Sequence, residues 1–149
     1  MTDPTDPLDD IELWRMHTNS DANAEKALRR YRKWKRENRD GGGRLYLNEC
    51  ELQSLPREIG GLTSLKELNC SGNKLRELPQ EIGRLTSLTR LDCPSNELRE
   101  LPPEIGRLTS LKIFNCFENE FVEGSPTTIE ALKERWLIYQ RRCIKGAKA

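Results

Sequence analysis

Hydrophobic positions recur every 23 residues through the middle of the chain. Residues 79–98 read PQEIGRLTSLTRLDCPSNEL, and residues 102–121 read PPEIGRLTSLKIFNCFENEF. The apolar classes at this spacing include Leu45, Leu68, Leu91 and Phe114; Leu47, Cys70, Cys93 and Cys116; Leu52, Leu75, Leu98 and Phe121; and Ile59, Ile82 and Ile105. Self-similarity at a fixed period of this length predicts a solenoid, in which equal coils stack upon one another.

Each unit contains one strand pattern and one short return segment. Leu68 and Cys70 alternate with the polar residues around them, which is the period of two expected for a strand. The following stretch EIGRLTSL has room for only one or two helical or 3₁₀ turns. No unit can bury its apolar side alone, so we expect stacking to bury a continuous strip of leucines.

The unit L-x-x-L-x-C-x-x-N-x-L, followed by x-x-L-P-x-E-I-G-x-L-T-S-L, resembles the leucine-rich repeat family. It is similar to the 23-residue typical class, which includes bacterial and Ras-suppressor-like members, and the resemblance covers residues 42–123. It implies an α/β solenoid of about four repeats, with a parallel sheet on the concave face. It also implies a ladder of buried carboxamides from Asn73, Asn96 and Asn119, with Cys50 at that place in the first unit.

The two flanks are predicted to be helical caps, because a solenoid needs lids over its apolar ends. Residues 1–41 form the predicted N-terminal cap, residues 42–123 the repeats, and residues 124–149 the C-terminal capping helix and tail. The apolar stripe of the first cap is Ala24, Ala27, Leu28, Tyr31 and Trp34. The apolar stripe of the second is Ile129, Leu132, Trp136, Tyr139 and Cys143.

The net charge of the 149 residues is only +1, so the chain as a whole is neither strongly acidic nor strongly basic. Charge is nevertheless unevenly distributed along the N-terminal part of the chain. Residues 1–25 carry seven acidic and one basic residue, whereas residues 26–44 carry nine basic and two acidic residues. The cations of the basic helix 26–36 are Lys26, Arg29, Arg30, Arg32, Lys33, Lys35 and Arg36. They suggest nucleic-acid or anionic-surface binding, against the alternative of a solvated lid helix balanced by the acidic residues 3–12. Tyr31 and Trp34 lie on the apolar stripe, so we expect them to turn inward.

Catalysis and metal binding find little support in the sequence. Cys70, Cys93 and Cys116 are 23 residues apart rather than in the close pairs of zinc sites, so they are predicted to be inert core residues. His17 is the only histidine, and no catalytic motif accompanies it. We therefore predict a protein that is not an enzyme and needs no cofactor or metal.

The predicted compartment follows from what the chain lacks and from its cysteines. No apolar run is long enough to cross a membrane, and the acidic, proline-rich start MTDPTDPLDD is unlike a secretory signal. Five cysteines without a disulfide framework are typical of a reducing compartment. The prediction is a cytoplasmic protein, and delivery by a specialised secretion machine stays open.

The resemblance implies that the concave face binds a partner. Strand side chains that flank the inward leucines point out of the sheet. These predicted partner-binding residues are Arg44, Tyr46, Glu67, Asn69, Arg90, Asp92, Ile113, Asn115 and Phe117. Phe117 is either an exposed anchor or a residue covered by the C-terminal helix. The predicted function is recognition of a protein partner of unknown identity, as a bacterial effector, an immunity or inhibitor protein, or a scaffold.

The register can be tested by truncating one inward leucine. We expect Leu91→Ala to lower the free energy of unfolding by about 2–5 kcal/mol, because it removes buried apolar surface and leaves a cavity. A chemical or thermal melt measures the change. A melt that does not move would contradict the repeat register.

Overall fold

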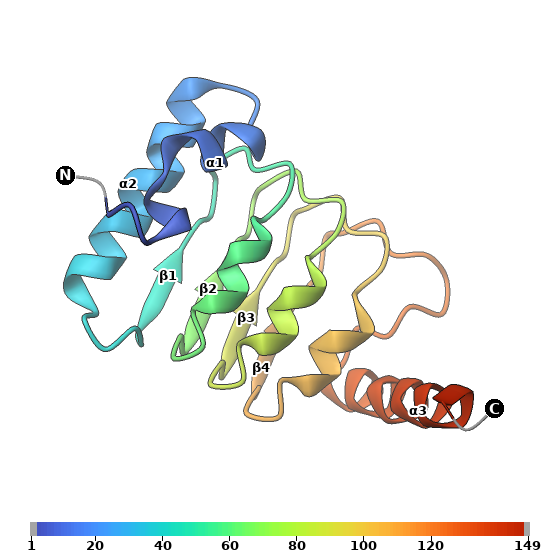
Figure 1. Cartoon of the computed structure of the whole chain (residues 1–149). Coiled ribbons are helices and arrows are strands. Elements are labelled where there is room, and N and C mark those ends of the chain that lie inside the picture. Colours follow the sequence, from blue (N-terminus) through green and yellow to red (C-terminus); the bar gives the residue numbers. More distant parts are fainter. Residues whose placement is uncertain (1–2, 148–149) are drawn as a thin grey trace.

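Four short parallel strands lie side by side along one face of a curved stack (Figure 1). The structure, a computed structural model, describes residues 3–147, with the side chains of residues 139–140 and 143–147 outside that description. The strands are β1 (Arg44–Tyr46), β2 (Glu67–Asn69), β3 (Arg90–Asp92) and β4 (Ile113–Asn115), in the order β1-β2-β3-β4. Leu45 pairs with Leu68, and Leu68 pairs with Leu91, so residues that are 23 apart in the sequence are neighbours across the sheet. The expected α/β leucine-rich-repeat solenoid is confirmed.

The return segments form 3₁₀ helices on the opposite side of the stack. They are η2 (Arg57–Gly61), η3 (Gln80–Arg84) and η4 (Pro103–Arg107). A proline in extended or near-extended conformation precedes each one, which suits a chain entering a short helix. Gly83 is required by close packing, because a Cβ there would lie 2.5 Å from the carbonyl oxygen of Glu104 in the next coil.

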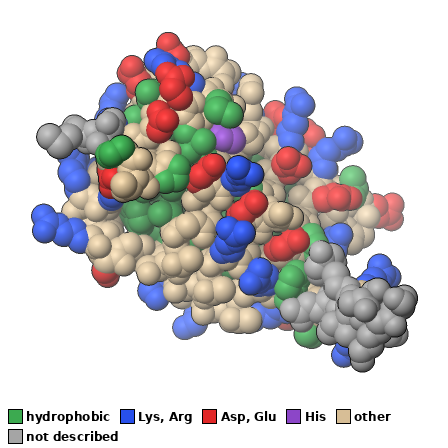
Figure 2. Space-filling view, in the orientation of Figure 1, with side chains coloured by type: hydrophobic (Ala, Val, Ile, Leu, Met, Phe, Trp, Pro, Cys, Tyr) green, Lys and Arg blue, Asp and Glu red, His purple; other side chains and the backbone are tan. Residues whose placement is uncertain are grey.

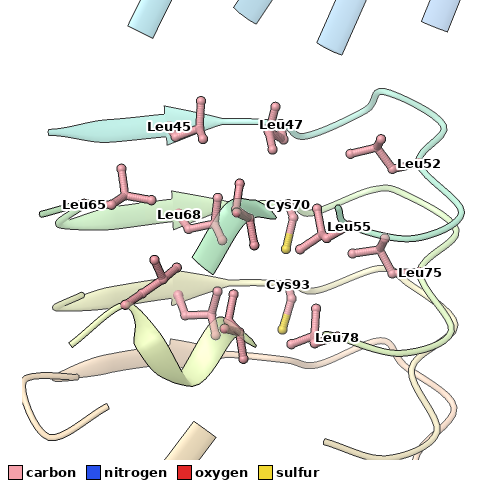
Figure 3. Close-up of a cluster of buried hydrophobic side chains, with 14 of the residues drawn as sticks. Leu45, Leu47, Leu52, Leu55, Leu65, Leu68, Cys70, Leu75, Leu78 and Cys93 are labelled. Atoms are coloured by element: carbon pink, nitrogen blue, oxygen red, sulfur yellow. The ribbon is translucent and has the colours of Figure 1, made fainter. Parts of the chain in front are cut away.

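The core is a column of leucines with cysteines at its sheet side (Figure 3). Leu45, Leu68 and Leu91 are fully buried, and Cys70 and Cys93 lie beside them at the same place in successive coils. Buried apolar surface contributes about 25 cal/mol per Å², so this column is the main stabilising term of the repeats.

The asparagine ladder implied by the resemblance is present. The side-chain oxygen of Asn73 accepts hydrogen bonds from the backbone N–H groups of Cys50 (2.9 Å) and Leu52 (3.0 Å) in the coil before it. Its amide nitrogen donates to the carbonyls of Leu47 and Cys70, both at 2.9 Å. Asn96 and Asn119 repeat the pattern one and two coils later. Each carboxamide therefore joins two coils and satisfies buried backbone groups that no strand can pair.

Every coil turns after its strand through a residue with positive φ. These residues are Glu49 (53°), Gly72 (63°), Ser95 (54°) and Glu118 (54°), again 23 apart. Only one of them is glycine, the residue that adopts this conformation without steric cost. The sequence pattern gave no sign of this turn, because the repeat does not place glycine there.

Three helical segments cover the N-terminal end of the stack. They are η1 (Pro7–Asp9), α1 (Ile11–Met16) and α2 (Asp21–Glu37), and α2 contacts β1. Ser20 caps α2 by accepting a hydrogen bond from the N–H of Asn23. The predicted apolar stripe of α2 is buried throughout.

Helix α3 (Ile129–Ala147) covers the other end and packs against η4. Its first turn is capped by Thr128, whose hydroxyl accepts from the N–H of Ala131. Leu132 is buried, and both its carbonyl oxygen and the Trp136 side chain lie against Gly106. The predicted face residues Tyr139 and Cys143 lie outside the described side chains. The division of the chain into an N-terminal cap (residues 1–41), repeats (residues 42–123) and a C-terminal cap (residues 124–149) stays a prediction.

Removal of one ladder rung should destabilise the stack. We expect Asn96→Ala to lower the free energy of unfolding by about 1–3 kcal/mol for each backbone group left buried without a partner. Urea denaturation measures the loss. The matched control is Glu77→Ala, since Glu77 is exposed in the neighbouring coil and should leave the midpoint unchanged. Equal midpoints for both variants would show that the ladder contributes nothing.

Candidate functional site

Three large apolar side chains are exposed along the concave face of the sheet. Tyr46 on β1 is 48% exposed, Ile113 on β4 is 43% exposed, and Phe117 just after β4 is 63% exposed. Helix α3 packs on η4 and leaves Phe117 uncovered, so the alternative in which the C-terminal helix covers this ring is wrong. An exposed apolar ring beside a sheet strand can anchor a protein partner.

The charged side chains that lie on the sheet between Tyr46 and Ile113 form ion pairs with one another. Arg44 Nε lies 2.9 Å from Glu67 Oε2, and Arg90 Nε lies 2.6 Å from Asp92 Oδ2. Hydrogen bonding to Asp92, and then its charge, raises the pKa of Arg90 above its usual value. Asn115 donates to the other oxygen of Asp92 at 2.5 Å. Asn69 is held in turn by the backbone and hydroxyl of Ser71.

Asp92 departs from the sequence prediction. The alternating pattern placed it on the exposed face, but only 9% of its surface is exposed, because Arg90 and Asn115 cover the carboxylate. Asp92 therefore orders its neighbours and offers little surface of its own to a partner. The prediction that it contacts a partner directly stays untested, and its geometry favours a supporting role.

The face is long and shallow. Tyr46 and Asn115 belong to one column but lie three strands apart, roughly 14 Å at the usual strand spacing. The hollow over β1–β3 has a volume of about 170 Å³ and is lined by Arg44, Tyr46, Glu67, Asn69, Arg90 and Asp92. Sites for small organic ligands usually exceed about 300 Å³. The shape suits a segment of protein better than a small molecule.

Most cations of the basic helix α2 are engaged within the cap. Arg32 pairs with Asp9, and Lys35 Nζ lies 2.6 Å from Asp6 Oδ2 and 3.1 Å from Asp3 Oδ2. Hydrogen bonds from Thr5, and then from Lys35, lower the pKa of Asp3 to about 2, so it remains charged. The acidic start of the chain thus neutralises part of the helix.

The remaining cations of α2 divide into two groups. Lys26 donates to the carbonyl of Glu49 at 2.5 Å, and Arg30 donates to the Asn48 backbone and side chain. Lys33 is 4.0 Å from Glu37. Arg29 and Arg36 form no ion pair or hydrogen bond within the described part of the chain. Fewer cations are therefore available to an anion than the sequence suggests.

The aromatic residues of α2 face the core, as predicted. Tyr31 and Trp34 are buried, with the Tyr31 hydroxyl donating to Asp6 Oδ2 at 2.7 Å and the Trp34 indole donating to the Gly42 carbonyl at 2.9 Å. Burial, and then the bond to Asp6, raises the pKa of Tyr31. These rings cannot stack on bases. On the face seen in Figure 2, acidic and basic side chains are interspersed rather than gathered by sign.

The described residues offer no constellation for metal binding. No three of their histidine, cysteine, aspartate and glutamate side chains are placed to hold a metal ion. Burial, and then the charge of Asp92, raises the pKa of the Cys70 thiol to about 12, and burial raises the pKa of Cys93 well above its usual value. His17 Nδ1 is 2.6 Å from Ser54 Oγ, and burial lowers its pKa. Within residues 3–147, no helix has the length and apolarity needed to cross a bilayer.

The stacked coils and the four-stranded parallel sheet define a solenoid built from repeats. The model of the leucine-rich repeat region matches residues 44–135, and the chain belongs to this family. A leucine-rich repeat protein from Leptospira interrogans has a similar solved structure, with a TM-score of 0.53 and 36% sequence identity. The match covers 57% of this chain and 22% of that protein, so the chain spans about a fifth of its length. No curated protein matches the chain.

The buried thiols should resist modification in the native protein. Because burial raises the pKa of Cys70 and Cys93, we expect little thiolate and little iodoacetamide labelling at neutral pH. Peptide mass spectrometry measures labelling at each site, and unfolding in urea should expose both residues fully. Rapid labelling of Cys70 in the folded protein would contradict its inert core role.

Proposed function

We propose that this chain is a non-enzymatic recognition module whose concave sheet face binds a protein partner. The leucine-rich repeat family and fold suggest a protein-interaction module, and the family is generally non-enzymatic. The observation that carries the finer proposal is the exposure of Ile113 and Phe117 at one end of a face whose charged groups are already paired.

The face is organised before any partner arrives. Its strands are fixed by the asparagine ladder, and Arg90, Asp92 and Asn115 hold one another in place. Binding to such a surface orders few side chains, so less free energy is spent on lost conformational freedom. Ile113 and Phe117 supply apolar surface that gains by leaving water.

The chemistry of the partner follows from the pattern across the sheet. An apolar side chain would contact Phe117 and Ile113, and polar or charged groups would meet Arg44, Glu67 and Arg90. Tyr46 would contribute a second, partly apolar contact at the far end of the face. The likeness to the Leptospira protein supports a bacterial setting. Within that setting, the candidate roles are a cytoplasmic scaffold, a delivered effector, and an immunity or inhibitor protein.

A second candidate is binding of nucleic acid or an anionic surface by helix α2. It rests on Arg29, Lys33 and Arg36, the cations that the cap engages least. It has less support, because Tyr31 and Trp34 are buried and the acidic segment pairs with Arg32 and Lys35. Such binding would weaken steeply as salt increases.

Affinity capture with the full chain tests the proposed face. We expect Phe117→Ala to reduce capture of the protein partner by about tenfold or more, since an aromatic anchor that is buried on binding costs over about 1 kcal/mol when truncated. The thermal melt should barely move, because this ring is exposed. Capture from the native cell at low and at high salt, with quantitative mass spectrometry, measures the effect.

The matched control is Val122→Ala, an exposed apolar residue outside the concave columns. It should capture the partner as the parent chain does. Equal capture by the Phe117 variant would contradict the concave-face proposal. Salt-sensitive capture of nucleic acid, lost on reversal of Arg29 and Arg36, would establish the second candidate in its place.

A further inference from the structure

A small hollow lies where helix α2 meets the first strand of the sheet. Helix α2 packs beside β1 (Figure 1), and the space between their side chains has a volume of about 240 Å³. Its lining residues, which define the α2–β1 hollow, are Arg30, Lys33, Trp34, Glu37, Arg44 and Tyr46. Arg44 and Tyr46 also line the hollow over β1–β3. The concave face therefore continues from the strands onto the helix.

The lining of the α2–β1 hollow is mainly cationic, because Glu37 is the only acidic residue in it. Lys33 Nζ lies 4.0 Å from Glu37 Oε1, and the two side chains are 67% and 61% exposed. An exposed ion pair of this kind contributes little and is easily rearranged. Glu67 of the neighbouring strand pairs with Arg44. Even with Glu67 counted, the cations outnumber the acids, so the hollow attracts an anion.

Arg30 is held in place without losing its charge. Its Nη1 donates to the backbone carbonyl of Asn48 and, at 3.0 Å, to the side-chain oxygen of the same residue. Asn48 is neutral, so these bonds position the guanidinium but do not neutralise it. By contrast, Lys35 on the same helix pairs with Asp6. The Nε and Nη2 groups of Arg30 form no hydrogen bond within the described part of the chain and can donate to a partner.

The hydroxyl of Tyr46 adds a further donor to the hollow. Hydrogen bonding to Tyr46, and then the charge of Glu67, raises the pKa of Arg44. A guanidinium can only donate, so the Tyr46 oxygen accepts this bond and its own hydrogen is left for another acceptor. Guanidinium groups match the geometry of a carboxylate, which accepts several hydrogen bonds at once. The donors of the hollow therefore fit an acidic side chain.

The β4 end of the face has the opposite character. A hollow of about 330 Å³ beside Phe117 is also lined by Phe114 and Phe121, and within the described residues its only charged lining residue is Glu118. Ile113 and Phe117 are exposed at this end. Glu118 repels an acidic side chain, whereas the α2–β1 hollow attracts one. The face therefore distinguishes the acidic position of a bound segment from its apolar position.

The sheet sets the distance between these two positions. Arg44 pairs with Glu67, Glu67 pairs with Arg90, and Arg90 pairs with Ile113, so these residues form one row across the four strands. Three strand spacings amount to roughly 14 Å. An extended chain advances about 3.3 Å per residue and covers this distance in about four residues.

We propose that a protein partner of the concave face places an acidic side chain in the α2–β1 hollow. An apolar side chain about four residues away, along an extended segment of that partner, then contacts Ile113 and Phe117. Arg30, Arg44 and the Tyr46 hydroxyl bind the carboxylate. This proposal rests on the proposed function, because it specifies the partner of the same face. It also extends that face to Arg30, which lies outside the strand columns.

Peptide selection with the full chain tests this partner chemistry. The probe is a phage-displayed library of random peptides of about twelve residues, which extend roughly 40 Å and so cross the sheet. Peptides that also bind the Phe117→Ala chain are removed, so that the remaining peptides depend on the concave face. We expect these peptides to be enriched in Asp or Glu about four positions from an apolar residue.

The variant Arg30→Gln tests the hollow with a synthetic copy of the most enriched peptide. Glutamine keeps a donor for Asn48 but removes the charge. We expect the dissociation constant to rise about tenfold, and replacement of the peptide's acidic residue by its amide to cause a similar rise. The two changes together should cause little further loss, because they remove the same interaction. Isothermal titration calorimetry measures binding, and thermal melts verify folding.

The matched control is Arg29→Gln, which removes the same charge from an exposed residue of α2 that does not line the hollow. It should bind the peptide as the parent chain does. Equal weakening by both variants would attribute the effect to overall charge and would overturn the proposal.

The remaining outcomes separate this proposal from the proposed function. Peptides that depend on Phe117 but show no acidic enrichment would overturn the acidic-partner proposal and leave the concave face as a binding site. A folded Arg30→Gln chain that binds the acidic peptide like the parent would have the same consequence. Displacement of the peptide by single-stranded DNA through Arg30 would assign the hollow to phosphate groups instead. Failure to select any Phe117-dependent peptide would overturn both proposals.

Discussion

The buried carboxamide of each repeat is the interaction on which this structure depends. A coil this short leaves backbone donors and acceptors facing inward at the bend after each strand, where water cannot reach them. Asn73, Asn96 and Asn119 satisfy these groups and at the same time join each coil to the one before it. Because one side chain performs both tasks, coil length and coil spacing cannot vary independently. The regular sheet face is the outcome of that constraint.

The two ends of the solenoid are closed by different means. At the N-terminal end, aromatic rings of α2 are buried against the first coil, and a set of ion pairs with residues 3–9 holds the acidic segment in place. At the C-terminal end, α3 covers the side that carries η4 and leaves the sheet side open. The exposed apolar residues of the molecule's concave face are concentrated where the covering is incomplete.

Much of the architecture could be predicted from the sequence, because the same apolar and polar positions recur in every 23-residue unit. Inward leucines, the cysteine column and the ladder asparagines all follow from spacing and from the family resemblance. The predictions that failed or stayed open depend on contacts between distant segments. Asp92 is buried by neighbours on its own and the next strand, and the exposure of Phe117 depends on where α3 lies. The sequence left open whether the acidic residues 3–12 balance the basic helix, because Asp6 and Asp9 lie more than twenty residues before their partners Lys35 and Arg32.

Glycine at the 3₁₀ helix also has a consequence for how such proteins change size. Gly60 and Gly83 accept the backbone of the following coil, and Gly106 accepts the helix α3 backbone and Trp136 in the same place. Helix α3 therefore packs on the same glycine position that each earlier coil uses to contact the next coil. Duplication of a whole 23-residue unit would place the same glycine at the new last coil. The number of repeats could therefore increase without any change to helix α3.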